Sequence, residues 1–236
     1  MKPNLDVKIY ADGAKISDMV SAYESGLVQG FTTNPSLMKQ AGITDYMAFA
    51  KEALAKLPGL PISFEVFADD FEAMEQEAEK IAALGKDVYI KIPIINTKGE
   101  STAHLIKKLS AKGYNLNITA ILTIPQVQET VDAFAPNTKN VVSVFAGRIA
   151  DTGVDPIPTM KQAKEICVTK PGTELLWASC REVLNIIQAN EVGAEIITCP
   201  PGVISKLGGL GQDLFQVSLD TVKTFSKDIK ALGFTI

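Results

Sequence analysis

The segment Asp87-Val88-Tyr89-Ile90-Lys91-Ile92-Pro93-Ile94-Ile95 places one lysine inside an otherwise almost wholly apolar run. Glycines at 85 and 99 flank the run, which is typical of a strand buried on both faces. Lysine is almost never fully buried without a partner. Because burial penalises the charged ammonium, a buried lysine loses its proton more easily and can form a Schiff base with a ketone. The alternative is a lysine at a strand end that reaches water or pairs with a carboxylate.

Short apolar runs alternate with helical patterns on both sides of this segment. Helical periodicity covers residues 16–26, 46–57, 69–84 and 103–112, and a further helix is expected to begin at Pro125. Eight such units without a change in composition predict one parallel α/β domain over residues 1–236. The predicted strands are residues 7–11, 30–32, 62–67, 88–92, 115–119, 141–145, 175–178 and 195–198.

A polar residue stands within two positions of the end of each predicted strand. An open sheet gathers its ligands mainly at one switch point, whereas a closed barrel gathers them from the ends of many strands. No GxGxxG follows the first strand, which weakens a dinucleotide-binding interpretation. We therefore predict a single (β/α)8 TIM barrel. The polar residues at the strand ends are Asp12, Asn34, Glu65, Lys91, Asn117, Ser143, Ser179 and Thr198, and the three intervals between Glu65 and Ser143 are each 26 positions.

The segment after the eighth strand has a different pattern. Cys199-Pro200-Pro201-Gly202 is expected to stop the strand, and Gly208-Gly209-Leu210-Gly211 to be flexible. Residues 212–236 then form an additional C-terminal helix with an apolar stripe that includes Phe215, Val222 and Phe225. Such a stripe packs either on its own barrel or on a neighbouring subunit.

Composition excludes several classes of function. The 236-residue chain has a formal net charge of −4, which argues against a nucleic-acid partner. It has no signal-peptide pattern and no apolar run long enough for a membrane span. Its three cysteines fit no zinc pattern and its single histidine, His104, cannot support a histidine-based metal site. We expect a reduced, cytoplasmic setting, with no metal and no membrane partner.

Several motifs at the predicted strand ends resemble those of the transaldolase family, in order and over nearly the whole chain. The length resembles the compact branch of that family, whose members are oligomers. The resemblance implies a cofactor-free class I transaldolase that forms a homo-oligomer. The motifs are Gly30-Phe31-Thr32-Thr33-Asn34-Pro35-Ser36, Lys91-Ile92-Pro93, Asn115-Leu116-Asn117-Ile118-Thr119, Ser143-Val144-Phe145-Ala146-Gly147-Arg148-Ile149 and Trp177-Ala178-Ser179-Cys180-Arg181.

The same resemblance implies a role for each candidate residue. Lys91 would form the imine with a ketose phosphate, and Asp12 would transfer protons during carbon–carbon cleavage. Glu65 and Thr119 would hold a water that shuttles protons. Asn34, Asn117 and Ser143 would contact the three-carbon unit, and Arg148, Ser179 and Arg181 would hold the anionic end of the sugar phosphate. Chemistry agrees, because a protonated imine is an electron sink and paired guanidinium groups bind phosphate.

Two positions separate branches of the resembled family. Its fructose-6-phosphate aldolase branch carries Gln where Glu65 stands and Tyr where Phe145 stands, so both positions favour a true transaldolase of the pentose phosphate pathway. The alternatives are that aldolase activity, or transfer from another anionic ketose such as a sulfo-sugar. A non-catalytic barrel that only binds a partner is a third alternative. The full set of acid, base, lysine and anion-binding residues argues against it.

Overall fold

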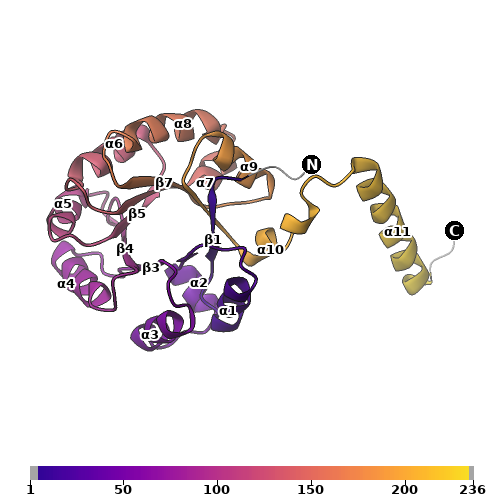
Figure 1. Cartoon of the computed structure of the whole chain (residues 1–236), viewed down its shortest axis with the longest axis horizontal. Coiled ribbons are helices and arrows are strands. Elements are labelled where there is room, and N and C mark those ends of the chain that lie inside the picture. Colours follow the sequence, from indigo (N-terminus) through magenta and orange to yellow (C-terminus); the bar gives the residue numbers. More distant parts are fainter. Residues whose placement is uncertain (1–4, 234–236) are drawn as a thin grey trace.

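The computed structural model describes residues 5–233, whose eight strands form one closed parallel barrel in sequence order. The prediction of a (β/α)8 barrel is confirmed (Figure 1). Each strand pairs with its neighbours along the chain, and the eighth closes onto the first. The strands are β1 (Lys8–Asp12), β2 (Phe31–Thr32), β3 (Ile62–Glu65), β4 (Val88–Pro93), β5 (Leu116–Ile121), β6 (Asn140–Val144), β7 (Thr173–Trp177) and β8 (Ile196–Cys199).

Helices follow the strands and surround the barrel (Figure 1). Capping side chains set several of their first turns, as when Asp70 accepts hydrogen bonds from the first turn of the helix after β3. The helices of the barrel are α1 (Ile16–Glu24), α2 (Pro35–Gln40), α3 (Tyr46–Lys56), α4 (Phe71–Ala82), α5 (Ala103–Ala111), α6 (Ile124–Ala133), α7 (Ala146–Asp151), α8 (Pro156–Cys167), α9 (Leu184–Glu191) and α10 (Pro201–Ile204).

The core lies inside the barrel and between the barrel and its helices. Strand residues such as Phe31, Phe64 and Ile92 are fully buried, as parallel strands covered on both faces require. The regular spacing seen in the sequence has a structural counterpart, because Glu65 pairs with Lys91 and Lys91 pairs with Asn117 in the strand register. Asn117 pairs with Val141, so Ser143 does not continue the series, and the register of β5 with β6 shifts beyond this point, between Ile118 and Ile121.

The chain leaves the barrel after β8 and ends in the long helix α11 (Leu214–Leu232). Pro201 begins the short helix α10, so the expected stop ends the strand but not regular structure. Part of the glycine segment, expected to be flexible, forms a 3₁₀ turn over Leu207–Gly209. Asp213 caps the start of α11, and Gly233 ends it in the left-handed conformation that glycine favours. The predicted C-terminal helix is present, and it stands apart from the barrel (Figure 1).

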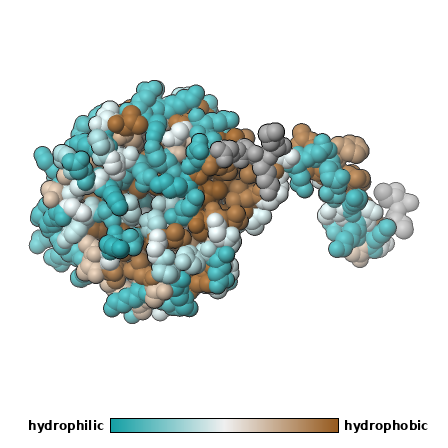
Figure 2. Space-filling model, in the orientation of Figure 1, coloured by the Kyte–Doolittle hydropathy of each residue, from teal (hydrophilic) through white to brown (hydrophobic). Residues whose placement is uncertain are grey.

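Hydropathy is unevenly distributed over the surface. Figure 2 shows apolar residues gathered on the side of the barrel that faces α11 and on α11 itself. Within residues 5–233, no helix is both long and apolar enough to cross a membrane.

Candidate active site

A cavity of about 490 Å³ opens at the carboxyl ends of the strands. Residues from both halves of the chain line it, as expected for the catalytic face of a barrel. Ten of the eleven predicted site residues lie in its wall, and Asn117 does not. Those ten are Asp12, Asn34, Glu65, Lys91, Thr119, Ser143, Phe145, Arg148, Ser179 and Arg181.

Lys91 lies inside the barrel near the inner end of this cavity. Only 6% of its surface is exposed, so the desolvation expected from its apolar strand is present. Its Nζ lies 3.0 Å from Glu65 Oε2 and donates a hydrogen bond of 3.0 Å to the Thr33 carbonyl oxygen. Glu65 belongs to the neighbouring strand and is in register with Lys91, which fixes the pair. The lysine is therefore both buried and paired with a carboxylate.

Asp12 approaches the same region from the end of β1. Thr32 Oγ1 donates a hydrogen bond of 2.9 Å to Asp12 Oδ1, and the Thr32 and Thr198 hydroxyl oxygens are 2.5 Å apart. Burial raises the pKa of Asp12 above its usual value, and the charge of Lys91 with the Thr32 hydrogen bond offsets only part of this. A carboxyl group whose proton is held more tightly than usual suits proton transfer.

Thr119 presents a hydroxyl group whose hydrogen-bonding capacity is not used by the protein. Its Oγ1 is buried and has no hydrogen-bond partner within residues 5–233. The next residue, Ala120, has a positive φ of 58°, and the strand register shifts at this point. A bulge of this kind redirects side chains at the mouth of a barrel. A buried hydroxyl without a protein partner is suited to hold a water or a substrate hydroxyl.

The two predicted asparagines occupy different places. Asn34 lines the cavity, and its Oδ1 also accepts a hydrogen bond from Leu37 N at the start of α2. Asn117 is buried beside the cavity rather than in its wall. Its Oδ1 accepts a hydrogen bond of 2.6 Å from Ser143 Oγ, and its Nδ2 donates one of 2.9 Å to Ser63 Oγ. In this structure Asn117 therefore orients Ser143, which does line the cavity.

The outer part of the cavity carries Arg148 and Arg181, which are the only two arginines in the chain. Arg148 lies over the Phe145 ring, with Cζ 5.4 Å from the ring centre. Arg181 Nη2 lies 2.5 Å from Asp151 Oδ2, and about half of each side chain is exposed. The exposed guanidinium groups make this end of the cavity suited to an anion.

Gly147 explains how the two arginines come together. A Cβ on this residue would lie 1.8 Å from the Ser179 carbonyl oxygen and 2.9 Å from Arg181 Nε. Ser179 itself has a positive φ of 62°. Only a residue without a side chain allows the segment after β7 to approach α7 this closely. The glycine thus brings Arg148 and Arg181 to one side of the cavity.

Some supporting residues are not among the predicted site residues. Thr32 holds Asp12, and the Thr33 carbonyl oxygen accepts from Lys91. Their position at the end of a short strand was the available signal. Tyr46 donates a hydrogen bond of 2.9 Å to the Glu65 carbonyl oxygen from α3. No pattern in the sequence links Tyr46 to Glu65, because the contact depends on how α3 packs against the barrel.

Curated proteins similar to this chain carry one recurring description. A probable transaldolase from Nitrosopumilus maritimus is 31% identical over 232 residues, covering 95% of this chain and 100% of that protein. A probable transaldolase from Sphingopyxis alaskensis is 35% identical, covering 85% and 89% of the two chains. One from Caldicellulosiruptor saccharolyticus is 34% identical, with coverage of 85% and 89%.

Solved structures show the same architecture at lower similarity. A dihydrodipicolinate synthase family protein from Coccidioides immitis aligns with a TM-score of 0.59 at 12% identity, over 84% of this chain and 68% of that one. That likeness concerns the fold alone. The family model described as Transaldolase/Fructose-6-phosphate aldolase matches residues 9–236. The resemblance found in the sequence is thereby confirmed, and the chain belongs to the transaldolase/fructose-6-phosphate aldolase family.

Proposed function

We propose that the protein is a transaldolase that moves a dihydroxyacetone unit from a ketose phosphate to an aldose phosphate through an imine on Lys91. The observation that carries this proposal is the position of Lys91 Nζ, buried in the barrel and 3.0 Å from Glu65 Oε2. An amine attacks a ketone only after it loses its proton, and Glu65 is placed to accept it. A protein that only binds a partner has no need of a buried amine that lies beside a carboxylate and borders a cavity.

The proton transfers of the reaction are assigned to Asp12, Glu65 and Thr119. Cleavage of the bond β to the imine requires a base that takes the proton from the hydroxyl group of the fragment that leaves as an aldehyde. Asp12 lines the cavity and would be this base. Its raised pKa favours holding the proton until an acceptor aldehyde arrives. Glu65 and Thr119 border the same cavity and would hold a water that relays protons during imine formation.

The remaining residues would hold the sugar phosphate. Asn34 and Ser143 border the cavity and would bind hydroxyl groups of the three-carbon unit, with Asn117 behind Ser143. Arg148 and Arg181, with Ser179, would bind the terminal phosphate, because a guanidinium group binds such an anion in a fork. Donors of the sedoheptulose 7-phosphate or fructose 6-phosphate type, in the pentose phosphate pathway, fit this arrangement.

Glu65 and Phe145 favour transfer over simple cleavage. Both border the cavity, and the Phe145 ring lies beneath Arg148. A phenylalanine has no hydroxyl group to protonate the carbanionic intermediate, which would then persist until an aldehyde binds. The alternative is fructose-6-phosphate aldolase activity, which the family description includes. A sulfonated ketose is a further alternative donor, since two arginines accept either anion.

The proposal is tested by trapping the imine. The protein is incubated with fructose 6-phosphate and borohydride, digested, and mapped by peptide mass. We expect the three-carbon adduct on the peptide that contains Lys91. An adduct on another lysine, or full activity in Lys91→Ala, would refute the proposed chemistry.

Setting and assembly belong to the same proposal. Cys167, Cys180 and Cys199 are all buried and unbridged, which suits a reducing cytoplasm. A single domain over residues 1–236 and a homo-oligomer both remain predictions. The exposed apolar face of α11 supports the oligomer.

A further inference from the structure

Of the strand-end residues identified in the sequence, only Thr198 has no part in the proposed reaction. It belongs to β8, is almost completely buried, and lines the candidate active-site cavity. Its hydroxyl oxygen lies 2.5 Å from that of Thr32 on β2. In the closed barrel β2 and β8 both pair with β1 and not with each other. The two hydroxyl groups therefore meet across the strand that carries Asp12.

The hydrogen bonds among these three residues have a single direction while Asp12 is ionised. A hydroxyl group has one hydrogen to donate, and an ionised carboxylate can only accept. Thr32 Oγ1 donates its hydrogen to Asp12 Oδ1 over 2.9 Å. The bond between the two threonines is therefore donated by Thr198 and accepted by Thr32. The result is a chain of two hydrogen bonds that begins at Thr198 and ends on the carboxylate.

This chain occupies one oxygen of Asp12 and leaves the other for the substrate. Oδ1 accepts from Thr32, whereas no donor within residues 5–233 forms a hydrogen bond with Oδ2. Hydrogen bonds in a chain polarise one another, so donation from Thr198 strengthens the bond that Thr32 makes to Asp12. It also restrains rotation of the Thr32 hydroxyl group, which would otherwise be free to turn its hydrogen away from the carboxylate.

We propose that Thr198 is a positioning residue that holds Asp12 for proton transfer by acting through Thr32. The chain keeps Oδ1 as an acceptor, and the proton of the substrate hydroxyl group is taken up and returned on Oδ2. The proton-transfer step rests on the proposed function, whereas the hydrogen-bond chain does not.

Other titratable groups also face the Asp12 carboxyl group. Burial raises the pKa of Asp12 most, the charge of Lys91 on β4 opposes this, and Glu65 on β3 raises it further. The Cys199 thiol, at the end of β8, is a further titratable group close to Asp12. These groups keep their places when only the Thr198 hydroxyl group is removed. A change in Asp12 on that removal therefore belongs to the hydrogen-bond chain.

Two substitutions of Thr198 separate the effect of its hydroxyl group from that of its volume. Thr198→Val removes the hydroxyl group and keeps the branched shape, and Thr198→Ser keeps the hydroxyl group. Thr32→Val removes the second member of the chain. The matched control is Thr130→Val, which removes another buried hydroxyl group. Thr130 lies in α6 outside the cavity wall and donates a hydrogen bond of 2.7 Å to the Gln126 carbonyl oxygen.

Infrared difference spectroscopy between pH values follows the protonated carboxyl band of Asp12 without any substrate. The band is assigned by its absence in Asp12→Asn. Because a hydrogen bond to the ionised form lowers the pKa of a carboxyl group, its loss raises that pKa. We expect the Asp12 titration to move to higher pH in Thr198→Val and further in Thr32→Val. Thr198→Ser and Thr130→Val should titrate as the wild type does.

Two results of the titration would refute the proposal. The first is an Asp12 titration that is unchanged in Thr198→Val. The second is a shift in Thr198→Val that Thr198→Ser shares in full, or that Thr130→Val reproduces, because the hydroxyl group at the end of the chain would then not be its cause.

Steady-state kinetics with a ketose donor and an aldose acceptor test the step that rests on the proposed function. Thr198→Val should lower kcat about two- to tenfold, the loss expected for one hydrogen bond, with little change in KM. A raised KM with unchanged kcat would mean that Thr198 contacts the substrate instead, which refutes the proposal. Borohydride trapping should give the Lys91 adduct in the wild type and in Thr198→Val. A wild type without the adduct would refute the proposed function, and the infrared titration would still decide whether the chain acts on Asp12.

Discussion

The two ends of the candidate active-site cavity differ in how far they are removed from water. At the inner end, Lys91 and Glu65 form an ion pair between adjacent strands with little exposed surface. At the outer end, Arg181 pairs with Asp151 while about half of both side chains remains exposed. The same kind of contact, a cation beside a carboxylate, therefore occurs in two very different environments.

Electrostatic interactions weaken in water and strengthen where water is excluded. Groups at the inner end can therefore change protonation and reactivity, whereas those at the outer end mainly bind and orient. This comparison predicts large effects for changes at the inner end and moderate effects at the outer end. Four experiments test it, beginning with the largest expected effect.

Removal of the inner amine should abolish the reaction. We expect Lys91→Ala to lower kcat by at least about 10³-fold, because loss of a covalent nucleophile is among the most damaging changes in an enzyme. The matched control is Lys8→Ala, which removes another lysine paired with a carboxylate, here Glu174, from a strand of the same barrel. Steady-state kinetics with a ketose donor and an aldose acceptor give both values. An equal loss of kcat in Lys91→Ala and Lys8→Ala would indicate a general effect on the barrel rather than the loss of a nucleophile.

Changes at the outer end should act on binding. Arg148→Ala or Arg181→Ala should raise KM for phosphorylated substrates by about ten- to a hundredfold, since a charge-assisted hydrogen bond contributes about 1.5–3 kcal/mol. Unphosphorylated substrates should be affected much less. Asp151→Asn is the control, because it removes the partner of Arg181 and keeps the cation. If KM rises equally for phosphorylated and unphosphorylated substrates, the arginines do not hold the anion.

Exchanging the two branch-specific residues should redirect the intermediate. Glu65→Gln with Phe145→Tyr changes the proton relay and adds a hydroxyl group near Arg148. We expect the ratio of aldol cleavage to transfer to rise on the order of tenfold, less than the 10²–10⁴-fold of a complete acid–base group. Release of free glyceraldehyde 3-phosphate without an acceptor, measured with a coupled dehydrogenase, gives the ratio. An unchanged ratio would contradict the assignment of these positions to branch choice.

The pH dependence of the free energy of unfolding should reveal the buried environment of Asp12. Because its pKa is raised, the native state holds this proton more tightly than the unfolded chain does. The contribution of Asp12 is complete below its unfolded pKa of about 4 and is lost as pH rises through the raised value. Asp12→Asn should therefore be more stable than the wild type above this window and not below it. Each unit of pKa difference contributes about 1.4 kcal/mol.

Urea unfolding at several pH values measures this effect. The control is Asp18→Asn in α1, where the carboxylate is half exposed and pairs with Lys15. A difference between Asp12→Asn and the wild type that does not depend on pH would contradict the burial argument.

The sequence alone determined the barrel and most of the residues that line the candidate active-site cavity. Periodicity separates strands from helices, and polar residues at the ends of parallel strands must meet at one face when the strands close into a barrel. The apolar run around Lys91 predicted burial, which the structure confirms. Motifs at five strand ends predicted the family, which the family model confirms.

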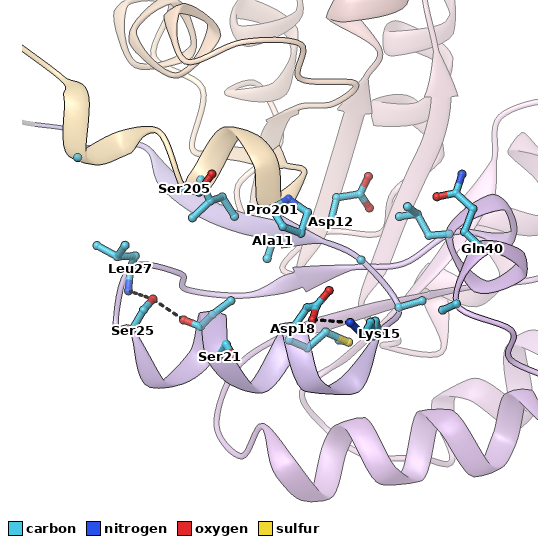
Figure 3. Close-up of a pocket in the computed structure, with 18 residues that line it drawn as sticks. Ala11, Asp12, Lys15, Asp18, Ser21, Ser25, Leu27, Gln40, Pro201 and Ser205 are labelled. Carbon is cyan, nitrogen blue, oxygen red and sulfur yellow. Dashed lines mark hydrogen bonds and ion pairs between the residues drawn. The ribbon is translucent and has the colours of Figure 1, made fainter. Parts of the chain in front are cut away.

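Only the tertiary structure decided which groups face the cavity and which stand behind them. Asn117 and Thr119 are two residues apart on β5, yet Thr119 lies in the cavity wall and Asn117 does not. Gly147 gains its importance from the Ser179 carbonyl oxygen, more than 30 positions away in the chain. A cavity outside the barrel is lined by Ser21 and Leu27 together with Pro201 and Ser205, so it combines residues from both ends of the chain (Figure 3). Such relations arise from packing between distant segments, and local patterns in a sequence do not contain them.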